Sequence, residues 1–188
     1  DEEARGRVPA AVVAPGAAPA AEPQQSQKSK AKTAAKPKGQ HAAEKPKTTL
    51  MLRNIPNDYT RQMLLDLLKE EGFEGKYDFV YLPVDLTSSA GLGYAFVNVA
   101  DPQVVPEVWA ALDGYKAWTI PTYKVCEVGW GDPHQGLMAN VRRYRNSPIM
   151  HESVPDEYKP MLFTDGARTE FPKPQKKLRA PRNRGRWQ

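Results

Sequence analysis

Residues 92–99, with the sequence LGYAFVNV, alternate between two kinds of side chain. Side chains on a β-strand point to opposite faces in turn, so Tyr94 and Phe96 would share one face. The other face would carry small and branched apolar side chains, namely Ala95, Val97 and Val99. The segment therefore predicts a strand with one face in a core and one face that presents two neighbouring aromatic rings.

Segments with strand and helix character alternate in a regular order through residues 48–130. Strand-like segments lie at 48–56, 77–84, 92–99 and 124–130, and amphipathic helical segments lie at 60–71 and 101–112. Thr60 is a suitable cap for the first helix, whereas Pro106 requires the second helix to kink or to begin later. The order β-α-β-β-α-β predicts an α+β, ferredoxin-like fold. Two helices would cover one face of a four-stranded antiparallel sheet and leave the other face open.

The open face of this sheet is the candidate binding surface. The alternation along the four strands assigns to it Met51, Arg53, Phe79, Tyr81, Tyr94, Phe96, Asn98 and Glu127. A register error of one residue would instead place Phe79 and Tyr81 in the core. Tyr94 and Phe96 have a different alternative, in which they pack under a third helix or against a protein partner.

A third helix is expected after the sheet, at about residues 132–146. Asp132 and Pro133 would begin it, and its apolar stripe consists of Leu137, Met138, Val141 and Tyr144. Positive charge is favourable in the last turn of a helix, where Arg142, Arg143 and Arg145 would lie as possible phosphate contacts. The helix could dock on the domain edge or cover part of the open sheet.

The two flanks of the domain are basic, and the domain itself is slightly acidic. Residues 1–47, an Ala/Pro/Lys-rich stretch expected to be disordered, carry a net charge of +4, and residues 48–150 carry −3. Residues 151–188 carry +4 and complete the total of +5. Residues 147–188 are expected to form a mostly disordered basic tail after a domain that spans 48–146. Basic flanks suit salt-dependent contacts with nucleic acid, or they serve only to keep the chain soluble.

Several functional classes are not expected. A single cysteine, Cys126, excludes an internal disulfide and a cysteine-rich zinc site. No apolar run reaches the ~20 residues of a membrane span, and no signal-peptide pattern precedes the domain. We therefore expect an intracellular protein, nuclear or cytoplasmic or both, with no membrane partner. The first residue is not Met, as in a fragment of a longer chain.

The residues of the open face suit contacts with unpaired bases. Residues 92–99 fit most of the longer ribonucleoprotein signature of the RNA recognition motif, except that Leu92 replaces its basic residue and Val99 its last aromatic. On the first strand, Met51 occupies a position where the motif normally has an aromatic ring. Arg53 and Asn98 could read base edges, and Glu127 could accept hydrogen bonds from exocyclic amines.

Residues 48–146 resemble the C-terminal RNA recognition motif of the Mei-two-like RNA-binding proteins. The resemblance rests on separate blocks in the same order, which are residues 48–57, 59–60, 63–65, 77–85, 93–98, 124–128 and 145–147. It implies RNA as the ligand, the sheet as its surface and Met51 as a family trait. The chain departs from the family at Leu92 and at residues 130–133, where the family tends to have a tyrosine-alanine-arginine run.

Three functions are compared. The leading hypothesis is a module that binds single-stranded RNA by aromatic stacking, without metal or cofactor, in post-transcriptional regulation. The alternative is a protein-interaction module that uses the same fold with protein partners. An enzyme such as an acylphosphatase is not expected, because the loop after the first strand lacks the glycine-rich composition of a phosphate cradle.

Overall fold

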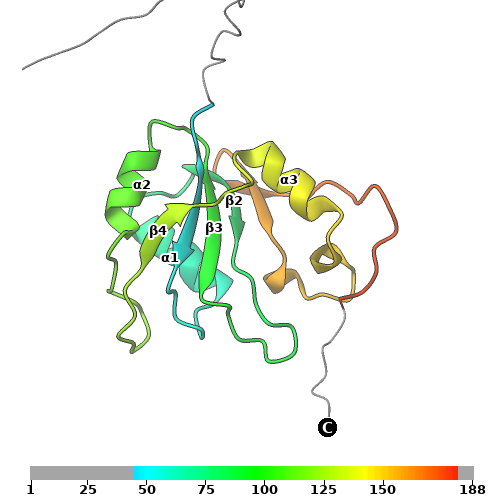
Figure 1. Cartoon of the computed structure of the whole chain (residues 1–188), viewed down its shortest axis with the longest axis horizontal. Coiled ribbons are helices and arrows are strands. Elements are labelled where there is room, and N and C mark those ends of the chain that lie inside the picture. The colour runs from blue at the N-terminus through cyan, green and yellow to red at the C-terminus, as the bar shows by residue number, and fades with distance from the viewer. Residues whose placement is uncertain (1–44, 182–188) are drawn as a thin grey trace, which may run out of the picture. The chain divides into compact units, whose positions relative to one another are not determined.

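The computed structural model describes residues 45–181, which fold around one antiparallel sheet (Figure 1). The sheet has six strands in the order β4-β1-β3-β2-β5-β6. Its elements are β1 (Thr49–Arg53), α1 (Arg61–Glu70), β2 (Tyr77–Tyr81), β3 (Tyr94–Val99), α2 (Val105–Leu112), β4 (Glu127–Trp130), α3 (Leu137–Arg145), β5 (Met161–Thr164) and β6 (Ala167–Thr169). The predicted β-α-β-β-α-β core is confirmed, but two further strands extend the predicted four-stranded sheet. The tail expected at residues 1–47 falls, as far as residue 44, outside the described residues.

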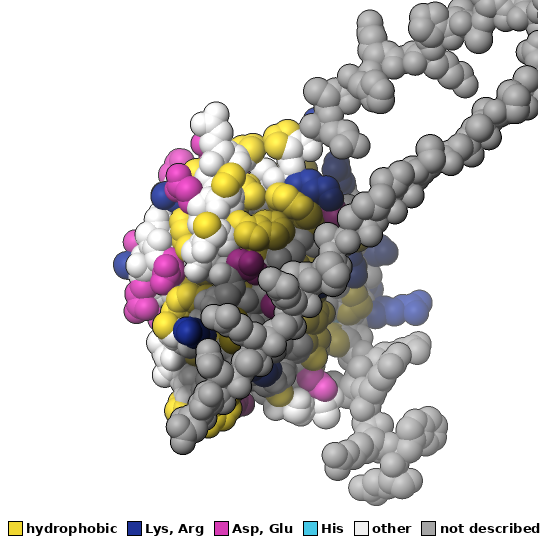
Figure 2. All heavy atoms as spheres, turned by 60° about the vertical axis from the view of Figure 1, so that its left-hand side comes forward, with side chains coloured by type: hydrophobic (Ala, Val, Ile, Leu, Met, Phe, Trp, Pro, Cys, Tyr) yellow, Lys and Arg dark blue, Asp and Glu magenta, His cyan; other side chains and the backbone are white. Residues whose placement is uncertain are grey.

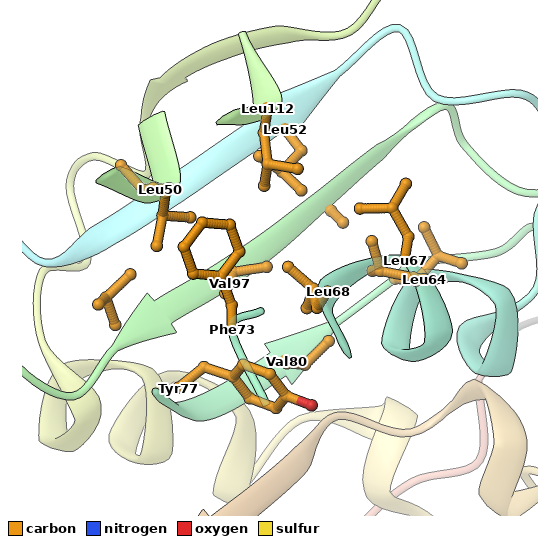
Figure 3. Close-up of a cluster of buried hydrophobic side chains, with 14 of the residues drawn as sticks. Leu50, Leu52, Leu64, Leu67, Leu68, Phe73, Tyr77, Val80, Val97 and Leu112 are labelled. Carbon is orange, nitrogen blue, oxygen red and sulfur yellow. The ribbon is translucent and has the colours of Figure 1, made fainter. Parts of the chain in front are cut away.

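The core lies between the sheet and the helices α1 and α2 (Figure 3). The inward side chains are fully or almost fully buried, and they include Leu50, Leu52, Val80, Val97, Leu64, Leu68, Val108 and Leu112. Each buried Leu or Val contributes roughly 1.5–3 kcal/mol relative to an exposed one. Because the inward residues of β1 and β3 are the ones that the alternation predicts, the register of these strands is confirmed.

The helix ends follow local chemistry. The Thr60 hydroxyl accepts a hydrogen bond from the Met63 amide at 3.2 Å and caps α1. α2 begins at Val105, so Pro106 lies in its first turn, where a missing amide hydrogen costs nothing. Of the two outcomes predicted for this proline, the later start is the observed one.

β5 and β6 correct the expectation that residues 147–188 are mostly disordered. They form a hairpin whose two turn residues are Asp165 and Gly166. Both residues have positive φ, as a type I′ turn requires. β5 pairs with β2, and Met161 and Phe163 join the core. This apolar burial holds the segment in place, and Asp165-Gly166 is a sequence signal for it.

An ion-pair clamp fastens this C-terminal extension to α1. One carboxylate oxygen of Asp156 accepts from Arg168 at 2.7 Å, and the other accepts from Arg61 at 3.1 Å. The hydrogen bond from Arg168, supported by the one from Arg61, lowers the pKa of Asp156 to about 2. The extension is therefore part of the folded domain.

Charge is distributed unevenly over the surface. Figure 2 shows Lys and Arg side chains along one edge of that view, whereas the opposite edge carries acidic side chains interspersed with Lys and Arg. None of the helices within residues 45–181 combines the length and the apolar composition that crossing a membrane requires.

Candidate nucleic-acid interface

One part of the outer sheet face remains accessible, on β4, β1 and β3. Met51 lies opposite Phe96, and Arg53 lies opposite Tyr94 in the β1–β3 pairing. Arg53 also lies opposite Glu127 of β4. We call these five residues the platform. They are partly or well exposed, so the platform keeps the outward orientation that the sequence predicts for them.

The two aromatic rings of the platform lie next to each other on β3. The ring centroids of Tyr94 and Phe96 are 5.7 Å apart, with an angle of 78° between the planes. Met51 borders Phe96 on the neighbouring strand, so a thioether continues the apolar surface from β3 to β1. This arrangement offers flat apolar area to more than one planar ligand group.

The charged groups of the platform are free to bind. Within residues 45–181, neither Arg53 nor Glu127 takes part in an ion pair. A methyl group added at Gly129 would lie 3.6 Å from Nη2 of Arg53, so the guanidinium extends across this glycine. Gly129 lies two residues after Glu127, so alternation along the strand places it on the same face. This alternation could have predicted from the sequence that Gly129 belongs to the outer surface.

Helix α3 covers the part of the outer face that β2 forms. The ring of Tyr144 stacks on Phe79 at 5.6 Å and 21°, and it meets Tyr81 edge-on at 4.8 Å. Phe79 is 0% exposed and Tyr81 is 8% exposed. Burial raises the pKa of Tyr81 and raises that of Tyr144 to about 12. Phe79 and Tyr81 point to the outer face of the sheet, as predicted. The prediction that they are accessible there is wrong, because α3 and Leu162 of β5 bury them.

Asn98 is also inaccessible, which corrects its assignment to the open surface. Its side chain is 2% exposed, and Oδ1 accepts hydrogen bonds from the hydroxyls of Thr48 at 2.9 Å and Thr49 at 2.7 Å. Its amide nitrogen donates to Asp78 at 2.7 Å. These partners occupy the groups that would otherwise read a base edge, so Asn98 has a structural role.

A buried polar junction fixes where α3 begins. Thr49 Oγ1 accepts from the Gly136 amide and from Asn140 Nδ2, each at 3.0 Å. Gln135 Oε1 accepts from the amides of Thr48 and Thr49 at 3.0 and 2.9 Å. Gly136 precedes the helix with φ at +84°, so α3 starts at Leu137 and not at the predicted Asp132–Pro133. Of the two predicted positions, the helix takes the one that covers part of the sheet.

The three predicted arginines lie at the end of α3. Arg142 and Arg143 are exposed and Arg145 is partly buried. The guanidinium carbon of Arg143 lies 5.5 Å from the centre of the Tyr144 ring. Because Tyr144 rests on Phe79 and Tyr81, Arg143 stands where the covered part of the face meets the platform. Within residues 45–181, no group of three or more His, Cys, Asp or Glu side chains is arranged to hold a metal ion.

Several known proteins are similar to this chain. The family described as RNA recognition motif 2 matches residues 47–145. Protein MEI2-like 3 of Arabidopsis thaliana is 37% identical over 69% of this chain and 16% of its own length. The meiosis protein mei2 of Schizosaccharomyces pombe is 33% identical over 71% of this chain and 18% of its own length. Among solved structures, the Rna15 RRM with bound RNA (GU) is 20% identical and has a TM-score of 0.41 over 52% of this chain and 97% of that one.

The chain therefore spans less than a fifth of the length of these curated relatives. The family match covers just over half of the chain, from two residues before β1 to the end of α3. It includes the platform, the junction at Thr49 and the helix that covers β2. On these grounds the chain belongs to the RNA recognition motif 2 family, in its MEI2-like branch.

Proposed function

We propose that this protein binds single-stranded RNA on the platform. The observation that carries the proposal is the adjacent pair Tyr94 and Phe96, accessible on β3 and bordered by Met51 and Arg53. RNA recognition motifs stack two or three bases on aromatic residues of such a sheet. Membership of the family supports the same ligand, and it favours RNA over the alternative of a protein-interaction module.

Each platform residue has a distinct task in this proposal. Two bases stack on Tyr94 and Phe96, which contributes about 1–3 kcal/mol per base before the cost of ordering the strand. Met51 covers part of a base by dispersion contacts. The guanidinium of Arg53 donates to base oxygen and ring-nitrogen acceptors, and the Glu127 carboxylate accepts from amino groups. Arg53 and Glu127 therefore select bases, whereas the rings accept any base.

The proposed activity is binding without catalysis, metal or cofactor, within a pathway of post-transcriptional regulation inside the cell. The support for this part is the family and the chemistry of the platform, which offers stacking and hydrogen-bonding groups. Asn98, Phe79 and Tyr81 are left out of the proposed surface because α3 and the Asn98 network bury them.

A pair of substitutions at one position tests the proposal. Phe96→Leu keeps much of the apolar volume but removes the ring, so we expect affinity for RNA to fall by about 1–3 kcal/mol. Phe96→Tyr keeps the ring and is expected to bind like the parent chain. Fluorescence anisotropy with an RNA selected from a random pool measures both, and urea unfolding checks that both variants are folded. Equal affinity of the folded Leu variant and the parent would refute stacking at this position.

A further inference from the structure

A group of positively charged side chains outside the platform lies beside the C-terminal end of α3. It consists of Arg142, Arg143 and Arg145 of the helix together with Lys173, Lys176, Lys177 and Arg179 of the C-terminal segment. We call these seven residues the basic strip. They come from two stretches about thirty residues apart in sequence, so their grouping is a product of the fold. In Figure 1, the segment after β6 passes beside the end of α3.

Specific contacts hold the C-terminal segment against α3. Phe171 packs into the cluster that contains Tyr144. Further along, Arg145 Nε donates to the Lys173 carbonyl, and the Gln175 amide donates to Asn146 Oδ1 at 2.9 Å. An apolar anchor and two hydrogen bonds therefore position the lysines beside the arginines of the helix.

Within the described part of the chain, no ion pair neutralises the charges of the basic strip. Five ion pairs are present within residues 45–181, and none of them includes a member of the strip. Neither α3 nor residues 171–181 contain an acidic side chain. Cations gathered on one part of a surface repel one another, which destabilises a compact arrangement unless an anionic ligand is bound. A ligand with several negative charges in a row fits such a surface best.

The basic strip is continuous with the platform. Arg143 lies over the ring of Tyr144, and that ring contacts Tyr81. Tyr81 is the β2 partner of Phe96 in the sheet, and neighbouring strands are about 4.8 Å apart. A strand of RNA that leaves the platform toward β2 therefore reaches Arg143 first and the lysines of the C-terminal segment next.

We infer that the basic strip binds the phosphates of the same RNA strand whose bases stack on the platform. The inference rests on the proposed function, and it extends the RNA-binding surface to residues 173–179. Contacts to phosphates strengthen and orient binding without reading sequence. The strip thus supplies the affinity that two stacked bases lack, and it offers phosphate-binding cations to a chain whose signature has the apolar Leu92 in place of a basic residue.

The test compares two double variants of the full chain with equal reduction of charge. Lys176→Ala/Lys177→Ala removes two exposed members of the strip. Lys69→Ala/Lys116→Ala removes two exposed lysines from α1 and the segment after α2, on the side of the sheet that the helices cover. Binding of a labelled random-sequence RNA of twelve nucleotides is measured between 50 and 200 mM salt. The same variants are tested with a three-nucleotide RNA and with vesicles that contain phosphatidylserine.

Removal of two phosphate-binding lysines makes the slope of log affinity against log salt less steep by about 1.4 for a single strand. Over this fourfold range of salt, the affinity of the parent should fall about sevenfold more than that of Lys176→Ala/Lys177→Ala. The control double should keep the parent slope, and the three-nucleotide RNA should bind all three proteins alike. The inference would be overturned if the two double variants had equal salt slopes. It would also be overturned if Lys176→Ala/Lys177→Ala weakened binding to vesicles but not to RNA. Failure of the parent chain to bind either RNA would instead refute the proposed function.

Discussion

Thr49→Val is the substitution that most directly tests how α3 is held on the sheet. Valine has nearly the same shape as threonine, so the change removes a hydroxyl without opening a cavity. The Thr49 hydroxyl uses its full capacity of one donor and two acceptor positions. It donates to Asn98 Oδ1 at 2.7 Å and accepts from Gly136 and Asn140 at 3.0 Å each.

The expected cost follows from the hydrogen bonds that each partner gives up. The partly buried Gly136 amide is left without this acceptor, which costs at most the roughly 1–3 kcal/mol of an unsatisfied buried group. Asn98 Oδ1 keeps the Thr48 hydroxyl and Asn140 Nδ2 keeps the Gly136 carbonyl, so each of these atoms gives up one of its two bonds, worth roughly 0.5–1.5 kcal/mol. We expect the free energy of unfolding to fall by about 2–4 kcal/mol, less than the sum because the partners relax.

Urea unfolding measures this change, with Thr48→Val as the matched control. Thr48 lies next in the chain and donates one hydrogen bond to Asn98 at 2.9 Å, so its removal should cost only about 0.5–1.5 kcal/mol. Hydrogen exchange at the Asn140 amide should accelerate in Thr49→Val and not in the control. If Thr49→Val lowers stability no more than Thr48→Val does, the junction does not hold α3 and the reasoning fails.

Two further predictions concern packing and pH. Gly131→Ala should destabilise the fold by about 1–3 kcal/mol in thermal unfolding, because its methyl group would lie 2.8 Å from Thr49 Cγ2 and 3.2 Å from Phe96 Cδ1. Gly129→Ala, where the nearest atom is 3.6 Å away, is the control and should leave stability nearly unchanged. Asp156, with its pKa lowered to about 2, should stabilise the fold above pH 4, and this contribution should disappear as the pH falls toward 2. Because its side chain is 60% exposed, the contribution is only about 0.5–1 kcal/mol, and an Asp156→Asn variant with the parent's acid unfolding curve would disprove it.

Sequence patterns predicted the two faces of the sheet because alternation along a strand is a local property. The neighbours of Tyr94 and Phe96 in β3 determine which way these rings point, and nothing distant changes that orientation. The same reasoning places Phe79 and Tyr81 on the outer face, where the structure has them. The face toward which a side chain points is therefore predictable even for residues whose accessibility is not.

Accessibility depended on segments far away in the chain. Phe79 is buried by Tyr144 and Leu162, which lie more than sixty residues later. The stripe on α3 predicts a packing face but does not specify the part of the sheet on which it packs. That choice is made by the bonds from Thr49 to Gly136 and by the surface that β5 adds beside β2. The hairpin itself was predictable, since the Asp165-Gly166 pair directly after the apolar run of β5 is a strong turn signal.

The position of α3 also decides how RNA can be accommodated. Displacing the helix would uncover the sides of Phe79 and Tyr81 that Tyr144 contacts and gain stacking of at most about 1–3 kcal/mol per base. It would also break two aromatic contacts of Tyr144, worth about 0.5–1.5 kcal/mol each, and the junction at Thr49, worth about 2–4 kcal/mol. The free energy gained by stacking and the free energy lost with these contacts are of similar size. Ordering the added nucleotides costs further free energy. On the proposed surface, RNA would therefore gain nothing by displacing α3, and we expect it to follow the platform onto the basic strip that α3 and the C-terminal segment form.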